Sequence, residues 1–383
     1  MKTYYFDYAA ATPLDSRVFS AMEPYLVDDF YNPSATYLRA QDAKKTLNTA
    51  RHDIAALLGA QSQTISFTAG VTEANNIFLQ GIALRYPNSH FIISAVEHES
   101  VRGVIEGLQE RGQLSFDIAP VDSNGHIQLD ALHALIRDNT VAISVIHVHN
   151  EFGTIQDLKA IASHIRTVRH QRIQSGNNTP LLLHTDAAQT ANYLSVNVSA
   201  LGVDAMSLSA AKLYGPKQVG VLYVARGTEI SPLFFGGEHE HGLRPGTQNV
   251  AGAVAMAESL KIAQESRQSE NERLEKLDTR LRQGLQHIPT ATMHIAKARR
   301  VPSLTSVHFD GVDAERLVME LDEAGIELGR GSACNAASGE PSQSLSAIGL
   351  SKAEAQSTIR IAMGRQTTNE DVNYLLDTLK GLV

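Results

Sequence analysis

The pattern of apolar and polar positions divides the chain at about residue 250. Between about residues 64 and 225, short apolar runs alternate with amphipathic segments. The apolar runs predict strands at Thr64–Phe67, Phe91–Val96, Leu114–Ala119, Val141–Val148, Leu181–Thr185, Ala205–Ser209 and Val219–Val224. The amphipathic segments predict helices at Thr72–Tyr86, Val101–Glu110, Asp130–Arg137 and Asp157–Arg169. Nearly continuous apolar strands separated by helices are typical of an α/β fold with a mostly parallel sheet, covered by helices on both faces.

Beyond residue 250 the pattern becomes mainly helical. Val250–Gln286 predicts one long helix, and its dense charge is typical of a solvent-facing surface. A strand at 305–309, a helix at 313–324 and a strand at 358–363 follow, and Thr368 with Asp371 forms a capping box that begins a terminal helix. We therefore expect a large domain at residues 14–255 and a smaller α+β domain that combines residues 1–13 with 256–383.

Composition narrows the class of protein. The chain has 383 residues, of which 43% are hydrophobic and 19% charged, as in ordinary globular proteins. A net charge of −8 without a long basic run argues against direct nucleic-acid binding and against an anionic membrane surface. No apolar run approaches the ~20 residues that span a bilayer, and residues 1–16 lack the apolar core of a secretory signal. A cytoplasmic protein is expected.

A carboxylate and a lysine follow two of the predicted strands. Asp186 ends the strand at 181–185, with Gln189 just after it, and Lys212 follows the strand at 205–209. In open α/β sheets, ligands bind beyond the carboxyl ends of the strands, so these groups are expected at one edge. Pyridoxal phosphate requires this pair, because its aldehyde forms a Schiff base with a lysine and its ring nitrogen is held protonated by a carboxylate. Lys217, five residues later, is the alternative lysine.

Other polar groups are predicted at the same edge. Gly70-Val71-Thr72 opens a helix after the first strand, where backbone N–H groups and the positive helix end favour a phosphate. Ser209 adds a hydroxyl, and the further groups at strand ends are Glu97, His98, His149 and Asn150. Each has an ordinary structural explanation, such as a helix cap, a packed histidine or a surface lysine. Their number at one edge favours a binding site.

The only cysteine, Cys334, lies in a segment of small polar residues at 330–338. A single cysteine excludes an intrachain disulfide and a four-cysteine zinc site. A buried structural cysteine is the commoner state of a lone cysteine. The small polar neighbours instead favour an accessible thiol that acts as a nucleophile. Composition alone leaves both interpretations open.

Two histidine pairs are candidate metal ligands. His147 and His149 are predicted to share one face of a strand, and His239 and His241 lie in a glycine-rich turn. Each pair supplies only two ligands, and neither matches the HExxH pattern. No metal site is predicted.

Ten motifs along the chain resemble, in order, the pyridoxal-phosphate cysteine desulfurases of the NifS/IscS type, which are class-V aminotransferases. They are FDYAAATPLD near the start, YNPSA at 31–35, FTAGVTEANN at 67–76, VEHES at 96–100, HVHNEFGTIQD at 147–157, HTDAAQT at 184–190, SLSAAKLYGPK at 207–217, GGEHEHGLRPGT at 236–247, GSACNAASGEPS at 331–342 and TIRIAMGR at 358–365. The resemblance covers nearly the whole chain. It implies a homodimer of fold type I, the aspartate-aminotransferase fold.

The resemblance also implies site residues. It implies that Lys212 forms the Schiff base with the cofactor and that Asp186 pairs with the ring nitrogen of the cofactor. Lys217 would lie on the surface or near the phosphate. The other cofactor contacts that it implies are His98 stacked on the ring, Gln189 and Asn150 near the ring oxygen, Gly70, Val71, Thr72 and Ser209 around the phosphate, and Thr247 at the phosphate from the neighbouring subunit. Arg360, together with Asn32, would hold the substrate carboxylate.

The implied reaction removes sulfur from L-cysteine and leaves L-alanine. Cys334 would take the sulfur as a persulfide and pass it to a protein acceptor, and either Lys212 or His98 would assist deprotonation at Cα. A selenocysteine lyase on the same fold and a non-catalytic assembly scaffold are the alternatives. Iron–sulfur cluster assembly, tRNA thiolation and DNA sulfur modification are all possible destinations of the sulfur.

The sequence departs from the family pattern beside the lysine. Ala211 stands where the family usually has a histidine that contacts the cofactor phosphate, and Ala210 stands where glycine is common. A charge-assisted hydrogen bond contributes about 1.5–3 kcal/mol, so weaker cofactor retention is expected. Asn335 replaces a frequent threonine and is expected to alter the cysteine segment.

Overall fold

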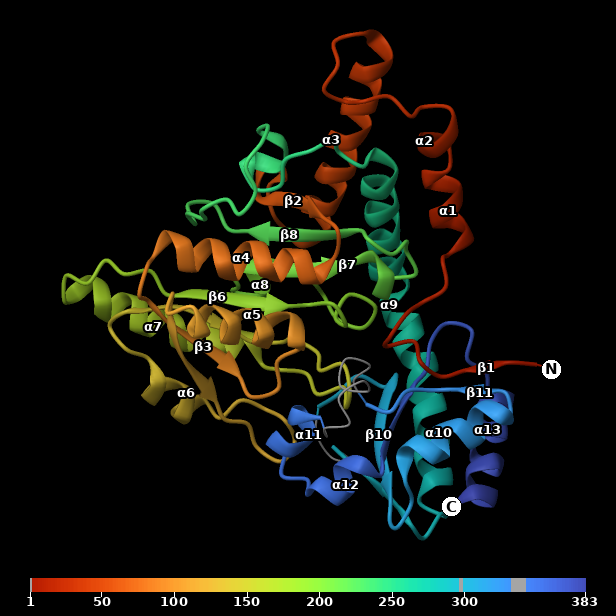
Figure 1. Cartoon of the computed structure of the whole chain (residues 1–383). Helices are drawn as coiled ribbons and strands as arrows, with labels where there is room; N and C mark the ends of the chain where they lie inside the picture. Colours follow the sequence, from red (N-terminus) through yellow and green to blue (C-terminus); the bar gives the residue numbers. More distant parts are fainter. Residues whose placement is uncertain (1, 296–298, 332–341) are drawn as a thin grey trace.

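A seven-stranded sheet forms the centre of the protein (Figure 1). The computed structural model describes residues 2–295, 299–331 and 342–383. The strand order is β2-β8-β7-β6-β5-β3-β4, and the bounds are β2 (Ile65–Thr68), β3 (His90–Ser94), β4 (Ser115–Ala119), β5 (Thr140–Ser144), β6 (Leu182–Asp186), β7 (Ala205–Ser209) and β8 (Gly220–Val224). Strand β8 runs antiparallel to its neighbours β2 and β7, and all other pairs are parallel. The predicted, mostly parallel sheet is confirmed.

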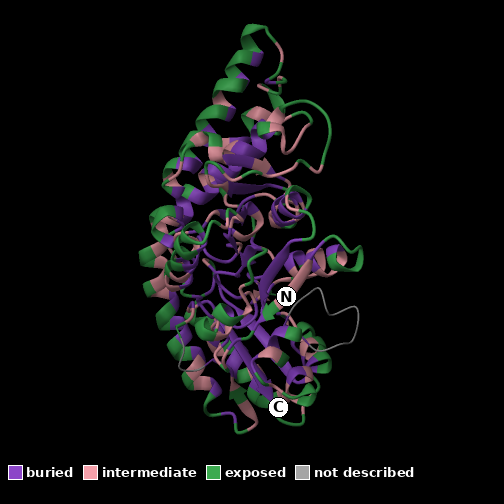
Figure 2. Cartoon of the chain, turned by 90° about the vertical axis from the view of Figure 1, so that its left-hand side faces the viewer, coloured by how far each residue is buried: buried purple, intermediate pink, exposed green. Residues whose placement is uncertain are grey.

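Helices cover both faces of this sheet. Their bounds are α3 (Leu38–Leu58), α4 (Val71–Arg85), α5 (Glu99–Glu110), α6 (Leu129–Leu135), α7 (Leu158–Gln174), α8 (Val198–Leu201) and α9 (Val250–Leu285). In β3, Ile92 packs into the core that α3, α7 and α9 share, whereas Phe91 and Ile93 pack into the core beneath α4 and α5. This alternation buries both faces of the strand. In Figure 2 the buried residues accordingly fill the interior, and the exposed ones lie on the outer helix surfaces.

A second core lies at the C-terminal end of the molecule (Figure 1). Its elements are β1 (Tyr4–Tyr5), β9 (Ala291–Met293), β10 (Leu304–Phe309), β11 (Ile326–Glu327), β12 (Thr358–Ala362), α10 (Ala314–Glu323) and α13 (Asn369–Leu382). Strand β10 pairs antiparallel with β9 and β12, and β1 pairs parallel with β11. The first residues of the chain therefore pack against its last third, as predicted.

Helix α9 belongs to both cores. Met256 near its start packs with the central sheet, and Leu281 near its end packs with Phe6 and Ile361. The domain limit predicted at residue 255 falls inside this helix, and the two domain boundaries stay a prediction. At the other end of the second core, the capping box of Thr368 and Asp371 that begins α13 is confirmed.

The remaining helices are short. They are α1 (Ser16–Met22), α2 (Pro24–Val27), α11 (Gln343–Ala347) and α12 (Lys352–Gln356). Within the described ranges, no helix combines the length and the apolar character that a membrane crossing requires.

One strand prediction is wrong at its end. Strand β5 stops at Ser144, so His147 and His149 lie in the segment after the sheet and not in a strand. The backbone N–H of His147 donates to the Asp186 carbonyl, and a turn at 149–154 then brings Ile155 back beside Val148. The apolar residues that follow Ser144, namely Val145, Ile146 and Val148, are buried although they lie beyond the end of β5. Periodicity does not distinguish such a segment from a strand.

Candidate active site

Asp186 is the last residue of β6 and is buried. Its Oδ1 accepts a hydrogen bond from the backbone N–H of Ala188 at 3.0 Å, and its Oδ2 accepts one from Nδ2 of Asn75 on α4 at 2.9 Å. A carboxylate offers about four lone-pair sites. The Asp186 carboxylate is thus oriented from two sides and keeps acceptor capacity for the N–H of a protonated ring.

Lys212 follows β7 in a short 3₁₀ turn and reaches the N-terminal segment. Its Nζ donates to the carbonyl of Ala9 at 2.9 Å and also to that of Ala10. Nε2 of Gln189 donates to the same Ala9 carbonyl at 2.9 Å. The structure therefore brings Lys212 and Gln189 together, while Lys217 donates separately to the Thr12 carbonyl at 3.2 Å.

The predicted phosphate cradle lies at the start of α4. Gly70 has φ of 131°, and a Cβ built on it would lie 3.9 Å from Oγ of Ser209, so the turn and this hydroxyl are neighbours. A Cβ on Gly220 would lie 2.6 Å from Cα of Gly70, which shows how closely the two backbones approach. Thr72 adds an exposed position in the first turn of α4. These features are those of an anion site at a helix N-terminus.

His98 caps the N-terminus of α5. Its Nδ1 accepts from the backbone N–H of Ser100 at 3.1 Å and lies 2.8 Å from Oγ of the same serine. Nδ2 of Asn75 also donates to Ser100 Oγ, at 2.9 Å. Ser100 and Asn75 therefore join His98 to Asp186, and the sequence did not predict either of them. Both lie inside motifs that carry the resemblance, which is the only signal that points to them.

Arg360 lies on β12 and is only 3% exposed. One terminal nitrogen (NH2) lies 2.6 Å from Oδ1 of Asp7, and the other (NH1) donates to the carbonyl of Asn150 at 3.2 Å. Among the described residues, its Nε is buried without a hydrogen-bond partner. An unpaired buried donor is costly, and the carboxylate of a small substrate is a ligand that would satisfy it.

Two buried groups near the site have shifted pKa values. Burial, with the nearby Asp186 charge, raises the pKa of Glu97 to about 8, although its Oε1 accepts from the Ile146 backbone N–H. Burial, together with His98 and Arg360, lowers the pKa of His149 to about 3. His149 is therefore neutral at physiological pH, and it stacks on the ring of Phe152.

Three predicted residues are not brought to the site by contacts within the described chain. Asn32 is exposed, and its side chain accepts from the Ser34 backbone N–H. Thr247 is also exposed. Cys334 lies outside the described residues. The described neighbours of its segment are Gly331 and Ser342, and both lie against Glu151: Ser342 Oγ donates to Glu151 at 2.9 Å, and a Cβ on Gly331 would lie 3.2 Å from Glu151 Oε2.

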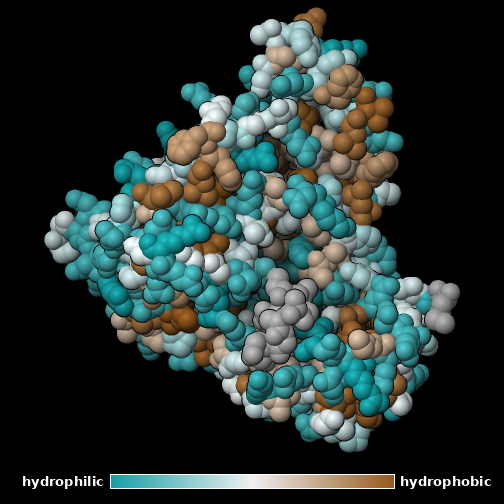
Figure 3. Space-filling model, in the orientation of Figure 1, coloured by the Kyte–Doolittle hydropathy of each residue, from teal (hydrophilic) through white to brown (hydrophobic). Residues whose placement is uncertain are grey.

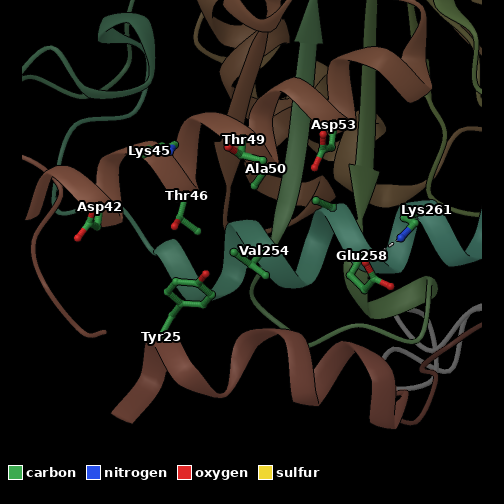
Figure 4. Close-up of a pocket in the computed structure, with 11 residues that line it drawn as sticks. Tyr25, Asp42, Lys45, Thr46, Thr49, Ala50, Asp53, Val254, Glu258 and Lys261 are labelled. Carbon is green, nitrogen blue, oxygen red and sulfur yellow. Dashed lines mark ion pairs between the residues drawn. The ribbon is translucent and has the colours of Figure 1, made fainter. Parts of the chain in front are cut away.

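A separate cavity of about 470 Å³ lies between α2, α3 and α9 (Figure 4). Its lining is mostly charged or hydroxylated and includes Tyr25, Asp42, Lys45, Thr46, Asp53, Glu258 and Lys261. It contains none of the predicted site residues, and Lys261 and Glu258 pair with each other at 3.7 Å. Within the described part of the chain, histidine, cysteine, aspartate and glutamate side chains nowhere gather in threes as metal ligands do.

The fold is that of the pyridoxal-phosphate enzymes of fold type I, with an acid, a lysine and a glycine turn at one sheet edge. The chain belongs to the class-V aminotransferases: residues 4–375 match the family Aminotransferase class-V. This family is pyridoxal-phosphate dependent.

Curated relatives and solved structures narrow this assignment. The chain is 38% identical to a cysteine desulfurase IscS of Dictyoglomus turgidum, over 99% of this chain and 94% of the relative. It is 35% identical to cysteine desulfurase IscS 1 of Archaeoglobus fulgidus, over 99% and 96%. A NifS-like protein superposes with a TM-score of 0.89 at 31% identity over 100% and 99% of the two chains. SspA in complex with cysteine superposes with a TM-score of 0.81 at 32% identity over 94% and 99%. The predicted resemblance is confirmed.

Proposed function

We infer that this chain is a cysteine desulfurase, which converts L-cysteine to L-alanine and transfers the sulfur to a cysteine of its own. The observation that carries this function is the buried Arg360, whose Nε has no partner among the described residues. The N-terminal segment links Arg360 to the lysine, because Asp7 pairs with Arg360 and Ala9 accepts from Lys212. The full-length likeness to proteins named cysteine desulfurase supports the choice of substrate.

The residues present fit pyridoxal phosphate. When bound, the cofactor supplies an aldehyde that condenses with amines and a protonated ring that withdraws electrons from the substrate Cα. Asp186 would accept the ring N–H, and Ser209, Thr72 and the N–H groups at Gly70 and Val71 would hold the phosphate. We propose Lys212 as the lysine that carries the cofactor, because it shares the Ala9 carbonyl with Gln189.

Arg360 would bind the cysteine carboxylate by a charge-assisted hydrogen bond and fix its orientation. The thiolate of Cys334 would attack the substrate sulfur, so that the C–S bond breaks as the S–S bond forms. Protons then reach Cα and Cβ, and L-cysteine plus the Cys334 thiol become L-alanine plus the Cys334 persulfide. Asn32 is proposed as a further contact of the substrate carboxylate.

Turnover of L-cysteine tests this function. The purified protein with pyridoxal phosphate should release L-alanine from L-cysteine, and Lys212→Ala should abolish the release. Lys217→Ala is the matched control and should keep the lysine–cofactor absorbance. Borohydride reduction and peptide mapping should place the cofactor on Lys212. Release of L-alanine from L-selenocysteine but not from L-cysteine would favour a selenocysteine lyase. A protein that stays colourless after pyridoxal phosphate is added would favour a non-catalytic scaffold.

We also propose a homodimer. Large apolar side chains are exposed on or near α1 and α2 and in the loop before residue 236, namely Phe19, Leu26, Val27, Phe30 and Phe235. Figure 3 shows hydrophobic residues gathered over α1 and α2. Exposed apolar groups of this kind are typical of interfaces. In such a dimer, the exposed Thr247 would reach the phosphate of the neighbouring subunit.

Mixed dimers test the role of Thr247. Subunits with Lys212→Ala and subunits with Thr247→Ala are each expected to be weakly active or inactive alone. If Thr247 serves the neighbouring site, mixing them should restore activity, because the Lys212-containing site then receives an intact threonine. If Thr247 serves its own site, mixing should restore nothing.

The acceptor of the sulfur is proposed to be a protein. Iron–sulfur cluster assembly is the proposed destination, because the curated relatives carry the name IscS; tRNA thiolation and DNA sulfur modification are the alternatives. Transfer of ³⁵S from labelled L-cysteine to proteins of the native extract, followed by identification of the labelled band, distinguishes these destinations.

A further inference from the structure

The position of the proton on His98 follows from a backbone contact. The Ser100 backbone N–H donates to His98 Nδ1 at 3.1 Å, and a backbone N–H can only donate. Nδ1 is therefore an acceptor and carries no hydrogen. A neutral imidazole has one N–H, so the hydrogen lies on Nε2.

The hydrogen bond that Asp186 accepts from Asn75 supports the same assignment. Nδ2 of Asn75 lies 2.9 Å from Asp186 Oδ2 and 2.9 Å from Ser100 Oγ, so its two hydrogens point to these two oxygens. The reversed amide would place its oxygen against the acceptor-only carboxylate. Because Ser100 Oγ accepts from Asn75, its own hydrogen is available to His98 Nδ1 at 2.8 Å.

The three residues that set this direction are shielded from water. Asn75 is 0%, Asp186 2% and Ser100 7% exposed. Water therefore has little access to the hydrogen bond between Asn75 and Asp186. A cavity of about 410 Å³ borders this group, and His98, Ser100 and Thr72 are among the residues that line it. With Nδ1 held by Ser100, Nε2–H is the hydrogen that the His98 ring can donate.

We propose that Asn75 and Ser100 are positioning residues that hold His98 as an Nε2–H donor, which leaves Lys212 to take the Cα proton. A base must present a lone pair, and the only lone pair of this His98 tautomer lies at Nδ1, where two donors of Ser100 occupy it. The amine of Lys212, by contrast, presents a lone pair when it is neutral. This inference rests on the proposed function and decides between the two bases that the sequence left open.

The hydroxyl of Ser100 is not needed for the helix cap. Capping of α5 uses the backbone N–H of Ser100, which Ser100→Ala keeps. The same substitution removes the O–H donor to His98 and the oxygen that accepts from Asn75 Nδ2, and it keeps the backbone N–H donor to His98. Ser100→Ala is thus expected to fold, and Ser100→Thr, which keeps a hydroxyl, is the matched rescue variant.

Nitrogen NMR of the holoenzyme labelled with ¹⁵N-histidine tests the tautomer. The His98 signals are assigned by their loss in His98→Gln. We expect Nδ1 without a hydrogen and Nε2 with one in the wild type. In Ser100→Ala the ratio of the two tautomers should shift toward Nδ1–H roughly two- to tenfold, as loss of one hydrogen bond implies, and Ser100→Thr should restore it. An Nδ1–H or doubly protonated ring in the wild type, or an unchanged ratio in Ser100→Ala, would overturn the proposal.

Exchange of the Cα hydrogen of L-alanine in D₂O tests the choice of base. His98→Gln keeps an N–H donor and should lose no more than about tenfold in exchange rate. Lys212→Ala should lose about 10²–10⁴-fold, the usual contribution of a general base. An equal loss in the two variants would overturn the proposal. Neither readout requires sulfur removal from cysteine, so failure of the proposed function is seen separately, as absence of L-alanine from L-cysteine.

Discussion

Asp7 and Arg360 lie 353 positions apart in the chain and form an ion pair of 2.6 Å at the candidate substrate site. The segment that carries Asp7 continues into Ala9, whose carbonyl accepts from Lys212. A short N-terminal stretch thus holds both the arginine proposed for the substrate and the lysine proposed for the cofactor. The ends of the sequence meet at the site because β1 pairs with β11 and Asp7 bridges to Ala362.

Removal of the Asp7 carboxylate should weaken substrate binding. Asp7 fixes one edge of the Arg360 guanidinium. A guanidinium without this contact loses more orientational entropy when it binds a carboxylate. Asp7→Ala should raise KM for L-cysteine about tenfold, or about 1.4 kcal/mol, with little change in kcat, as expected for lost uniform binding. Steady-state kinetics and the Kd of L-alanine measure the effect. Asp7→Asn, which keeps an acceptor oxygen, should retain most of the affinity; an unchanged KM in Asp7→Ala would contradict this role.

The buried Glu97 should make stability depend on pH. Its ordinary pKa is 4.5, and burial, with the Asp186 charge, raises it to about 8 in the folded chain. Between these values the folded state binds more protons than the unfolded state, so stability falls as pH rises through this window. Glu97→Gln stays neutral and should therefore gain stability over the wild type, on the order of a few kcal/mol, between pH 5 and pH 8.

Chemical denaturation of the cofactor-free protein measures this gain. Glu110→Gln changes an exposed glutamate of the same helix region and is the control. Its stability should follow that of the wild type at every pH. If the free energies of unfolding of the wild type and Glu97→Gln changed in parallel with pH, Glu97 would not carry a proton in the folded protein in this range.

The ion pair of Arg51 and Glu240 is buried, so loss of one partner should lower the stability of the fold. Two short contacts of 2.6 and 2.7 Å join the two side chains, which are 8% and 2% exposed. Glu240→Gln leaves the Arg51 charge buried and uncompensated, so the free energy of unfolding should fall by about 3–5 kcal/mol. The exposed pair of Arg85 and Glu229 is the control, and Glu229→Gln should cost less than about 1 kcal/mol. Equal losses in urea denaturation would contradict the expected difference.

Restoring the histidine before the lysine should improve cofactor retention. Ala211 is half-buried beside Lys212, where the family usually has a phosphate-binding histidine. One charge-assisted hydrogen bond of about 1.5–3 kcal/mol corresponds to roughly a tenfold or greater gain in affinity. Ala211→His should therefore lower the Kd of pyridoxal phosphate by about this factor, measured by fluorescence titration. Ala211→Gln, with a neutral side chain, should gain less, and an unchanged Kd in Ala211→His would place the phosphate elsewhere.

Much of the fold could be predicted from the sequence because apolar runs dominate its buried strands. The run Ala205–Ser209 is the observed β7, and α9 begins at Val250 as predicted. Asp186 and Lys212 could be found because both follow such runs. His147 and His149 lie beyond the end of the strand predicted for them, because a buried segment after a strand has the same apolar pattern as the strand itself.

The contacts that orient the site could not be predicted, because they depend on how helices pack. Ser100 lies in the first turn of α5, where polar residues ordinarily serve the helix cap. Asn75 lies in the second turn of α4. Only the packing of these two helices brings Asn75 to both Ser100 and Asp186. The pairing of Asp7 with Arg360 likewise requires the two ends of the chain to meet.

Trapping the sulfur on the enzyme tests the central claim most directly. The cofactor-loaded protein is mixed with L-cysteine without reductant, and the peptide that contains Cys334 is analysed by mass spectrometry while L-alanine is quantified. We predict one added sulfur atom on Cys334 and an equimolar amount of L-alanine, with neither product in Cys334→Ser. L-alanine formed at the wild-type rate by Cys334→Ser, or without added sulfur on Cys334, would contradict the account.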